Sequence, residues 1–82
     1  MKRKSYSVYL LQCKDGSLYT GIAVDVRQRF AQHQAGKGGH YTRAHGAVKI
    51  VHREKYPNRS AALKREAEIK KWGREEKLEL VK

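Results

Sequence analysis

The sequence predicts a small α/β domain of the α+β kind, a three-stranded antiparallel sheet flanked by helices in the order β-β-α-β-α-α. Three observations support this fold class. A chain of 82 residues has room for one domain, over residues 1–82. An Asp-Gly pair separates two short segments rich in aromatic and large apolar residues, which is typical of a β-hairpin. Helical and alternating apolar patterns then follow along the rest of the chain.

The first two strands are predicted on either side of a tight turn. The segments at 6–12 and 18–23 have strand composition, and the Asp15-Gly16 pair lies between them. Inside the second segment, Gly21 marks a place where another backbone or a ligand approaches closely, because a glycine leaves space that a side chain would fill. We therefore expect an antiparallel hairpin with a narrow approach at Gly21.

The first helix is predicted between Asp25 and Gly36. Asp25 fits an N-cap residue, with Gln28 three positions later as its reciprocal partner. Val26 and Phe30 recur at the helical spacing of four and form an apolar face. Gly36 then ends the helix.

A glycine-rich basic loop is predicted to follow, from Gly36 to Gly46. Its glycines exclude regular structure, and it carries Lys37, Tyr41 and Arg43. An aromatic side chain between two cations can stack on a base and clamp a single strand of nucleic acid. We therefore expect this loop to contact nucleic acid.

The third strand is predicted at residues 48–56. Strict alternation would place Ile50 and His52 on one face of this strand and Val51 and Arg53 on the other. The pattern therefore favours an amphipathic strand.

Two helices are predicted at the end of the chain. The first begins near Asn58 or Ser60, either of which can cap it, and runs to about Trp72. Gly73 breaks it, and a short last helix follows at 74–81. These helices complete the element order.

Charge and composition narrow the functional class. Nineteen Lys and Arg against eight Asp and Glu give a net charge of +11, which favours polyanions and above all nucleic acid. No apolar run approaches the roughly 20 residues that span a bilayer, and residues 1–4 form a basic arm with no signal-peptide core behind it. We therefore expect a soluble cytoplasmic protein with no membrane partner.

The cysteine count restricts the metal chemistry. Cys13 is the single cysteine, so an internal disulfide and a cysteine-based zinc site are excluded. Any bound metal must be held by oxygen or imidazole.

One carboxylate falls inside an apolar helical face. The 100° turn per residue places Glu66 in the same sector as Ala62 and Ile69. A carboxylate that faces a core is costly unless it is paired, hydrogen-bonded or coordinating a cation. The residues leave open whether Glu66 holds a cation or only extends to solvent or to a nearby arginine.

A second group of polar residues is predicted on the hairpin and the first helix. Arg29 and His33 are four residues apart and project from the same side of the helix, whereas Arg27 faces solvent. Tyr9 and Tyr19 are expected to pair across the hairpin with their hydroxyl groups available. Together with Glu66, these residues are candidates for a phosphodiester site.

This ordered set resembles the GIY-YIG nuclease domain over nearly the whole chain. Both name motifs are present in altered form, and the likeness is closest to small, stand-alone, single-domain bacterial members with a Gly-Lys-Gly loop followed by Tyr-Thr-Arg. The matching residues here are Ser7-Val8-Tyr9, Tyr19-Thr20-Gly21, Arg29, His33, the segment from Gly36 to Arg43, and Glu66.

The resemblance implies phosphodiester hydrolysis that depends on Mg²⁺ or Mn²⁺. Glu66 would be the sole protein ligand of the metal, and Arg29 would supply a fixed charge to the phosphate. Tyr9, assisted by His33, would accept the proton of the attacking water, with Tyr19 positioning that water or the phosphate. The sequence leaves open which tyrosine is the base.

Two departures from the family bear on activity and specificity. Several members carry a lysine directly after the second motif, where this chain has Ile22, so Lys37 or Arg43 are the candidates to replace its charge. The chain also lacks the appended DNA-recognition domain of larger family nucleases. Selection by the structure or single-strandedness of the nucleic acid is therefore expected.

The sequence thus predicts an endonuclease-type, metal-dependent hydrolase acting on DNA rather than RNA. Nucleic acid would be bound by Arg27, Lys37, Tyr41 and Arg43, and a monomer is expected. The alternative is a basic nucleic-acid-binding module that keeps the nuclease fold without catalysis. A protein-interaction domain would leave the charge and Glu66 unexplained.

Overall fold

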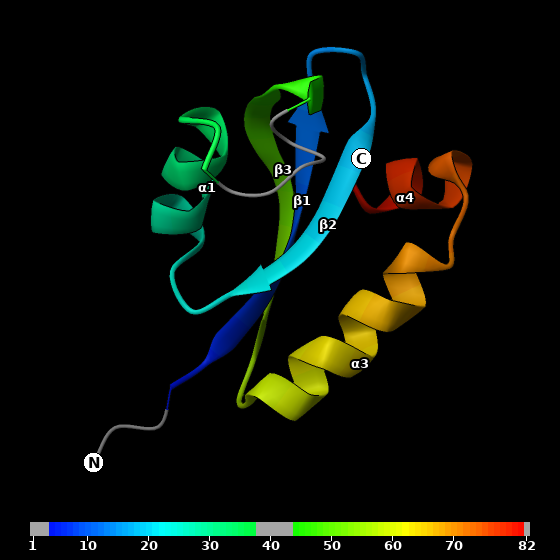
Figure 1. The fold of residues 1–82 in the computed structure, drawn as a ribbon. Helices are drawn as coiled ribbons and strands as arrows, with labels where there is room; N and C mark the ends of the chain where they lie inside the picture. The colour runs from blue at the N-terminus through cyan, green and yellow to red at the C-terminus, as the bar shows by residue number, and fades with distance from the viewer. Residues whose placement is uncertain (1–3, 38–43, 82) are drawn as a thin grey trace.

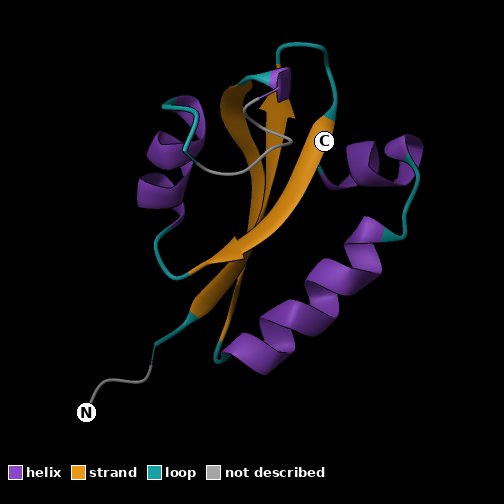
Figure 2. Ribbon diagram, in the orientation of Figure 1, coloured by secondary structure: helices purple, strands orange, loops and turns teal. Residues whose placement is uncertain are grey.

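The computed structural model describes residues 4–37 and 44–81 and confirms the predicted fold class (Figures 1 and 2). The elements come in the expected order, and each boundary lies close to its prediction. They are β1 (Tyr6–Cys13), β2 (Leu18–Ala23), α1 (Val26–Gln34), β3 (Ala47–Tyr56), α3 (Arg59–Lys70) and α4 (Arg74–Leu80).

The sheet is antiparallel with the strand order β2-β1-β3, and it separates two layers of helices. Figure 1 shows α1 on one side of the sheet and α3 with α4 on the other. Because successive side chains of a strand point to opposite faces, the central strand β1 supplies both halves of the core. Val8 and Leu10 pack with α3, whereas Tyr9 and Leu11 pack with α1.

The turn and cap residues predicted from the sequence lie where these elements begin or end. Gly16 has φ +82° in the hairpin turn. The Asp25 carboxylate accepts a hydrogen bond from the Gln28 amide at 3.1 Å, and the Asn58 side chain accepts one from the Ala61 amide at 2.9 Å. Asn58 is therefore the cap of α3, and Ser60 is not.

The pairing of Tyr9 with Tyr19 that the sequence suggested is wrong. In the observed register Tyr9 lies opposite Gly21, and Tyr19 lies opposite Leu11. The two tyrosines are diagonal neighbours on the face of the sheet that α1 covers, and their ring centroids are 6.4 Å apart. The hairpin therefore places a glycine, not an aromatic ring, directly beside Tyr9.

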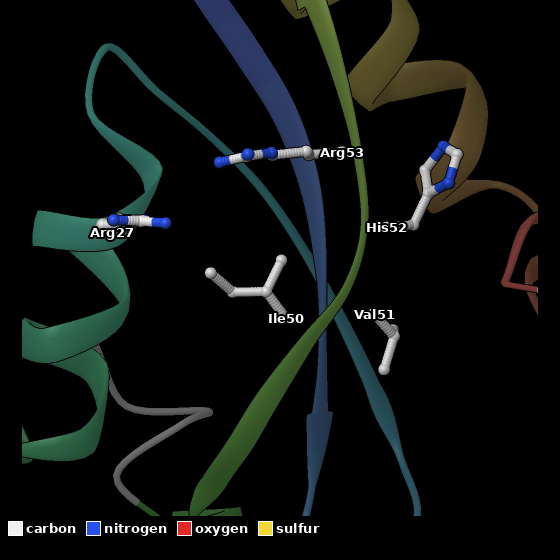
Figure 3. Close-up of a pocket in the computed structure, with 5 residues that line it drawn as sticks. All are labelled: Arg27, Ile50, Val51, His52 and Arg53. Atoms are coloured by element: carbon white, nitrogen blue, oxygen red, sulfur yellow. The ribbon is translucent and has the colours of Figure 1, made fainter.

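The strict alternation predicted for β3 is also wrong. Register shifts interrupt its pairing with β1, so that Ile50 lies opposite Leu11 and His52 lies opposite Leu10. The extra residue, Val51, reverses the alternation as a β-bulge does. Figure 3 shows the result, with Ile50 on the side of α1 and His52 on the opposite side of the strand.

A polar network fixes α3 against the sheet. The Glu54 carboxylate on β3 accepts hydrogen bonds from Arg65 Nε at 2.9 Å, Arg65 Nη2 at 3.2 Å, Tyr56 Oη at 2.7 Å and His52 Nε2 at 2.8 Å. The Arg65 guanidinium also lies 5.0 Å from the centre of the Trp72 ring. This network fixes how α3 is rotated about its own axis. It does so through Arg65, the residue next to Glu66.

Burial alone would raise the pKa of the Glu54 carboxyl, but the hydrogen bonds from Arg65, His52 and Tyr56 outweigh it and lower the pKa to about 2. A lowered pKa of the carboxyl group stabilises the fold at pH values above the ordinary pKa range of glutamate. This stabilisation is lost as the pH falls towards 2. We expect Glu54→Gln to lower the free energy of unfolding at neutral pH by roughly 2–3 kcal/mol.

The measurement is urea unfolding of both proteins from neutral to acidic pH. The difference between them should shrink as the pH falls, because the wild type then loses the same charge. The control is Glu75→Gln, which changes an exposed carboxylate on α4 that has no ion pair with any described residue. Equal effects of the two substitutions would mean that the network adds no stability.

Candidate active site

Tyr9 and His33 form a buried hydrogen bond under α1. The Tyr9 hydroxyl lies 3.0 Å from His33 Nε2, and each residue is 1% exposed. The sequence places Tyr9 at the middle of the central strand and His33 in the last turn of α1, so packing α1 on the sheet brings them together. The Tyr19 ring completes the group, edge-on to the His33 ring at 5.1 Å between centroids.

The protonation of this pair follows from its surroundings. Burial and the nearby Tyr19 raise the pKa of Tyr9 to about 12, against the opposing hydrogen bond and charge of Arg29. Burial, with the positive charge of Arg29 as a second cause, lowers the pKa of His33. At neutral pH the Tyr9 hydroxyl is therefore protonated and the His33 imidazole is neutral. The hydroxyl can donate to His33 Nε2 in the tautomer that carries its ring proton on Nδ1.

Arg29 reaches the same hydroxyl from α1. It is half-buried, its Nη1 donates to Gln32 Oε1 at 2.9 Å, and its charge acts on both Tyr9 and His33. The spacing of four residues predicted that Arg29 and His33 share one side of the helix, and the structure confirms it. A permanent cation thus lies beside a tyrosine and a neutral imidazole.

The close approach that the sequence predicted at Gly21 is present in the structure. A Cβ atom at this position would lie 2.6 Å from Tyr9 Oη and 2.7 Å from Tyr9 Cζ. The Tyr9 hydroxyl therefore passes directly over the backbone of β2. Only a glycine leaves room for it.

Glu66 lies on α3, across the sheet from His33, and is half-buried. Its neighbours in the helical stripe, Ala62 and Ile69, are fully buried, while the Glu66 side chain is 17% exposed. Its negative charge is one of the influences that raise the pKa of Tyr9. The Glu66 carboxylate forms an ion pair with Lys70, whose Nζ lies 3.4 Å from Glu66 Oε2, so the cation beside it is a lysine and not the arginine considered from the sequence.

The donor set at Glu66 fits a magnesium ion. Mg²⁺ is usually held by one or two carboxylates and keeps several water ligands. Among residues 4–37 and 44–81, no group of three or more His, Cys, Asp or Glu side chains could enclose a metal. Glu66 therefore offers a single hard oxygen donor near Tyr9, a donor set that would suit a hydrated divalent cation and not a closed zinc site.

The residues predicted to bind nucleic acid are dispersed. Arg27 is exposed on α1 and lines a hollow next to β3. Lys37 is exposed just after α1. Tyr41 and Arg43 fall outside the described residues, and of the rest of the predicted loop, residues 44 and 45 are helical.

Two cations on β3 were not among the nucleic-acid-binding residues predicted from the sequence. Arg53 and Lys55 lie in the hollow that contains Arg27. Their spacing of two on a strand was the available signal, since such residues share a face. Without the position of α1, nothing distinguished that face from an ordinary solvated one.

Comparisons with known proteins identify the family of the chain. The family described as GIY-YIG catalytic domain matches residues 5–79 of the chain. The chain belongs to the GIY-YIG family. This match spans β1 to α4 and so includes every described residue of the candidate site.

The relatives of this GIY-YIG domain are small proteins of similar length. The UPF0213 protein SA0446 of Staphylococcus aureus is 49% identical over 78 residues, which cover 95% of each chain. The solution NMR structure of the UPF0213 protein BH0048 from Bacillus halodurans is 42% identical, with a TM-score of 0.60 over 94% of this chain and 82% of that one. The solution NMR structure of EF2693 from E. faecalis is 40% identical, with a TM-score of 0.62 over 93% and 81%.

Membership in the GIY-YIG family implies a nuclease-type function and the binding of nucleic acid. The names of the relatives state no activity. In the described part of the chain, no helix has both the length and the apolar composition to cross a bilayer.

Proposed function

We propose that this protein is a metal-dependent endonuclease that hydrolyses phosphodiester bonds of DNA, with selectivity for single-stranded or branched structures. The supporting observation is the Tyr9 hydroxyl, which is hydrogen-bonded to His33 Nε2 while the charges of Arg29 and Glu66 act on it from two other elements. A base, a cation and a metal ligand around one hydroxyl are the groups that phosphodiester hydrolysis requires. A binding module needs none of the three.

Tyr9 and His33 act as a proton relay. A pKa of about 12 keeps the Tyr9 hydroxyl protonated at neutral pH, so it is not a preformed phenolate. It accepts a proton from the attacking water as its own proton passes to His33 Nε2, 3.0 Å away. His33 is the final acceptor because burial keeps its imidazole neutral. This assigns the base to Tyr9, and Tyr19 orients the His33 ring through their edge contact.

Arg29 and Glu66 act on the phosphate. The Arg29 guanidinium binds a phosphate oxygen beside Tyr9 and stabilises the negative charge that develops in the transition state. Glu66 would hold Mg²⁺ or Mn²⁺, which would supply positive charge to the phosphate and the leaving oxygen. The half-buried position of Glu66 strengthens its attraction for a cation, since water screens the charge less there.

The absence of the family lysine at Ile22 favours the binding module as a second candidate. Ile22 lies opposite Val8 and packs into the core cluster on the α3 side of the sheet, whereas Tyr9 lies on the α1 side. An isoleucine supplies no charge to lower the pKa of the Tyr9 hydroxyl. The relay to His33 answers this objection, since it needs no phenolate.

The deciding experiment is cleavage of end-labelled single-stranded, duplex and branched DNA, and of RNA. Each substrate is incubated with Mg²⁺, Mn²⁺ or EDTA. Metal-dependent products from single-stranded or branched DNA would support the proposal. Tight, salt-sensitive binding without any product would leave the binding module as the function.

The relay predicts the pH dependence of the reaction. Neutral His33 is the active form, and its pKa lies below the ordinary value of 6.5. We therefore expect kcat/KM to stay constant as the pH falls to 6.5 and to decline only below it, because protonated His33 cannot accept the Tyr9 proton. The check is kcat/KM against pH, together with an NMR titration of the His33 ring.

A decline with its midpoint above pH 6.5 would contradict this assignment. His33→Gln is the matched variant, since its amide fills similar space but does not titrate. It should lower kcat/KM by roughly 10²-fold and remove the acidic decline.

A further inference from the structure

Three exposed cations line a hollow between β3 and the start of α1. The hollow consists of two cavities of about 390 and 610 Å³ that share Arg27 and Arg53 in their linings, and Lys55 lines the larger one. Within the part of the chain that the structure describes, none of these three side chains forms an ion pair. The hollow therefore carries three positive side chains that form no ion pair among those residues, against one carboxylate in its lining, Asp25.

The strand register and α1 bring the three cations together. Arg53 lies opposite Tyr9 on β1, and Lys55 lies opposite Ser7, so both side chains point to the face that α1 covers. Figure 3 shows Arg53 reaching from the strand towards α1 and Arg27 reaching back towards the sheet. Like charges that converge repel one another, so an anion between them would be stabilised.

The other lining groups are compatible with a phosphate. Ser5 and Ser7 offer hydroxyl donors on the β1 side of the larger cavity. Asp25 is the one carboxylate in the lining, and its side chain accepts the Gln28 amide as the cap of α1. Arginine binds phosphate oxygens through paired N–H groups, and lysine adds a point charge.

We propose that this hollow binds a backbone phosphate of the same nucleic acid that is cut at Tyr9, as a second anchoring point on the far side of α1. The choice of nucleic acid as the ligand rests on the proposed function. A single free phosphate would share the same chemistry. The net charge of +11 and the nearby Tyr9 cluster favour a polyanion long enough to reach both places.

The geometry of α1 sets the length of that polyanion. Arg27 and Arg29 are two residues apart, which is about 200° around a helix, so they leave α1 on opposite sides. A strand that contacts both must cross the exposed side of α1, which is about 10 Å wide. At about 3.4 Å of axis per nucleotide in each strand, the two phosphates are separated by at least roughly three nucleotides.

The first test measures binding of a labelled oligonucleotide to the full chain in EDTA, so that cleavage plays no part. Arg53→Gln/Lys55→Gln should weaken binding about tenfold and lower the slope of log K against log salt by about one to two. The matched control is Lys64→Gln/Lys71→Gln, which removes two exposed positive charges from α3 and from the cap residue that follows it, on the other side of the sheet. Equal losses in the two double variants would overturn the proposal, since charge alone would then explain them.

A second test uses the wild-type protein and NMR. Adding the oligonucleotide should shift the amide resonances of Ser7, Arg53 and Lys55 at a much lower concentration than a dinucleotide does, because a dinucleotide cannot contact Arg29 and the hollow at once. Shifts of these amides by inorganic phosphate but not by the oligonucleotide would overturn the proposal in favour of a free-phosphate site.

The two proposals can fail separately. If DNA is cleaved but neither the Arg53→Gln/Lys55→Gln substitutions nor the NMR shifts show an effect at these residues, only the second anchoring point is refuted. Oligonucleotide shifts at these residues without any cleavage would remove only the proposed function.

Discussion

Glu66→Ala is expected to abolish cleavage while the affinity for DNA stays the same or rises. Glu66 is the metal ligand of the proposed site, and loss of a group that stabilises the charge of the transition state costs roughly 10²- to 10³-fold or more in rate. The substitution also removes a negative charge near the bound phosphate and releases Lys70, whose Nζ lies 3.4 Å from the carboxylate. Turnover should therefore be lost while binding stays the same or strengthens.

The control for this prediction is Glu68→Ala on the same helix. Glu68 is exposed and pairs with Arg65, so the two variants lose the same charge at positions about 200° apart around α3. Broadening of amide signals near residue 66 by Mn²⁺ gives a readout apart from activity, and it should disappear in Glu66→Ala alone. Unchanged turnover in Glu66→Ala would refute the metal-ligand assignment.

Gly21→Ala is expected to lower both activity and stability although it adds a single methyl group. The new Cβ would lie 2.6 Å from Tyr9 Oη and 3.1 Å from Tyr19 Cε2, and Tyr9 is 1% exposed, so its ring has no free space to enter. Overpacking of this kind typically costs about 1–3 kcal/mol of unfolding free energy. Displacing the Tyr9 hydroxyl by about 1 Å would also disrupt the relay to His33 and cost roughly 10²-fold in kcat.

Gly73→Ala is the matched control for Gly21. Gly73 has φ −75°, and the nearest atom to its added Cβ is Glu76 Oε1 at 3.9 Å, so the methyl group meets no obstacle. In Gly73→Ala, kcat should be close to wild type, and the loss of unfolding free energy should be smaller than in Gly21→Ala, since it reflects only the less favourable N-cap. Full activity of Gly21→Ala would show that the Tyr9 hydroxyl need not occupy its observed position.

The local features of this fold were predictable because neighbouring residues determine them. The Asp15-Gly16 pair fixed the hairpin turn, Asp25 and Asn58 capped their helices, and the spacing of four placed Arg29 and His33 on one side of α1. Each of these signals acts over fewer than five positions. The sequence also indicated the close approach at Gly21, because a glycine within a strand is costly without such a reason.

Only the tertiary structure decided how these elements meet. The bulge at Val51 reverses the faces of β3, and it depends on pairing with β1, which lies far away in the sequence. The same pairing places Arg53 and Lys55 on the side of Arg27, and the Glu54–Arg65 ion pair sets the rotation of α3 that holds Glu66 near Tyr9. Short-range patterns specify dihedral angles and periods, whereas register and helix rotation are fixed by contacts between distant segments.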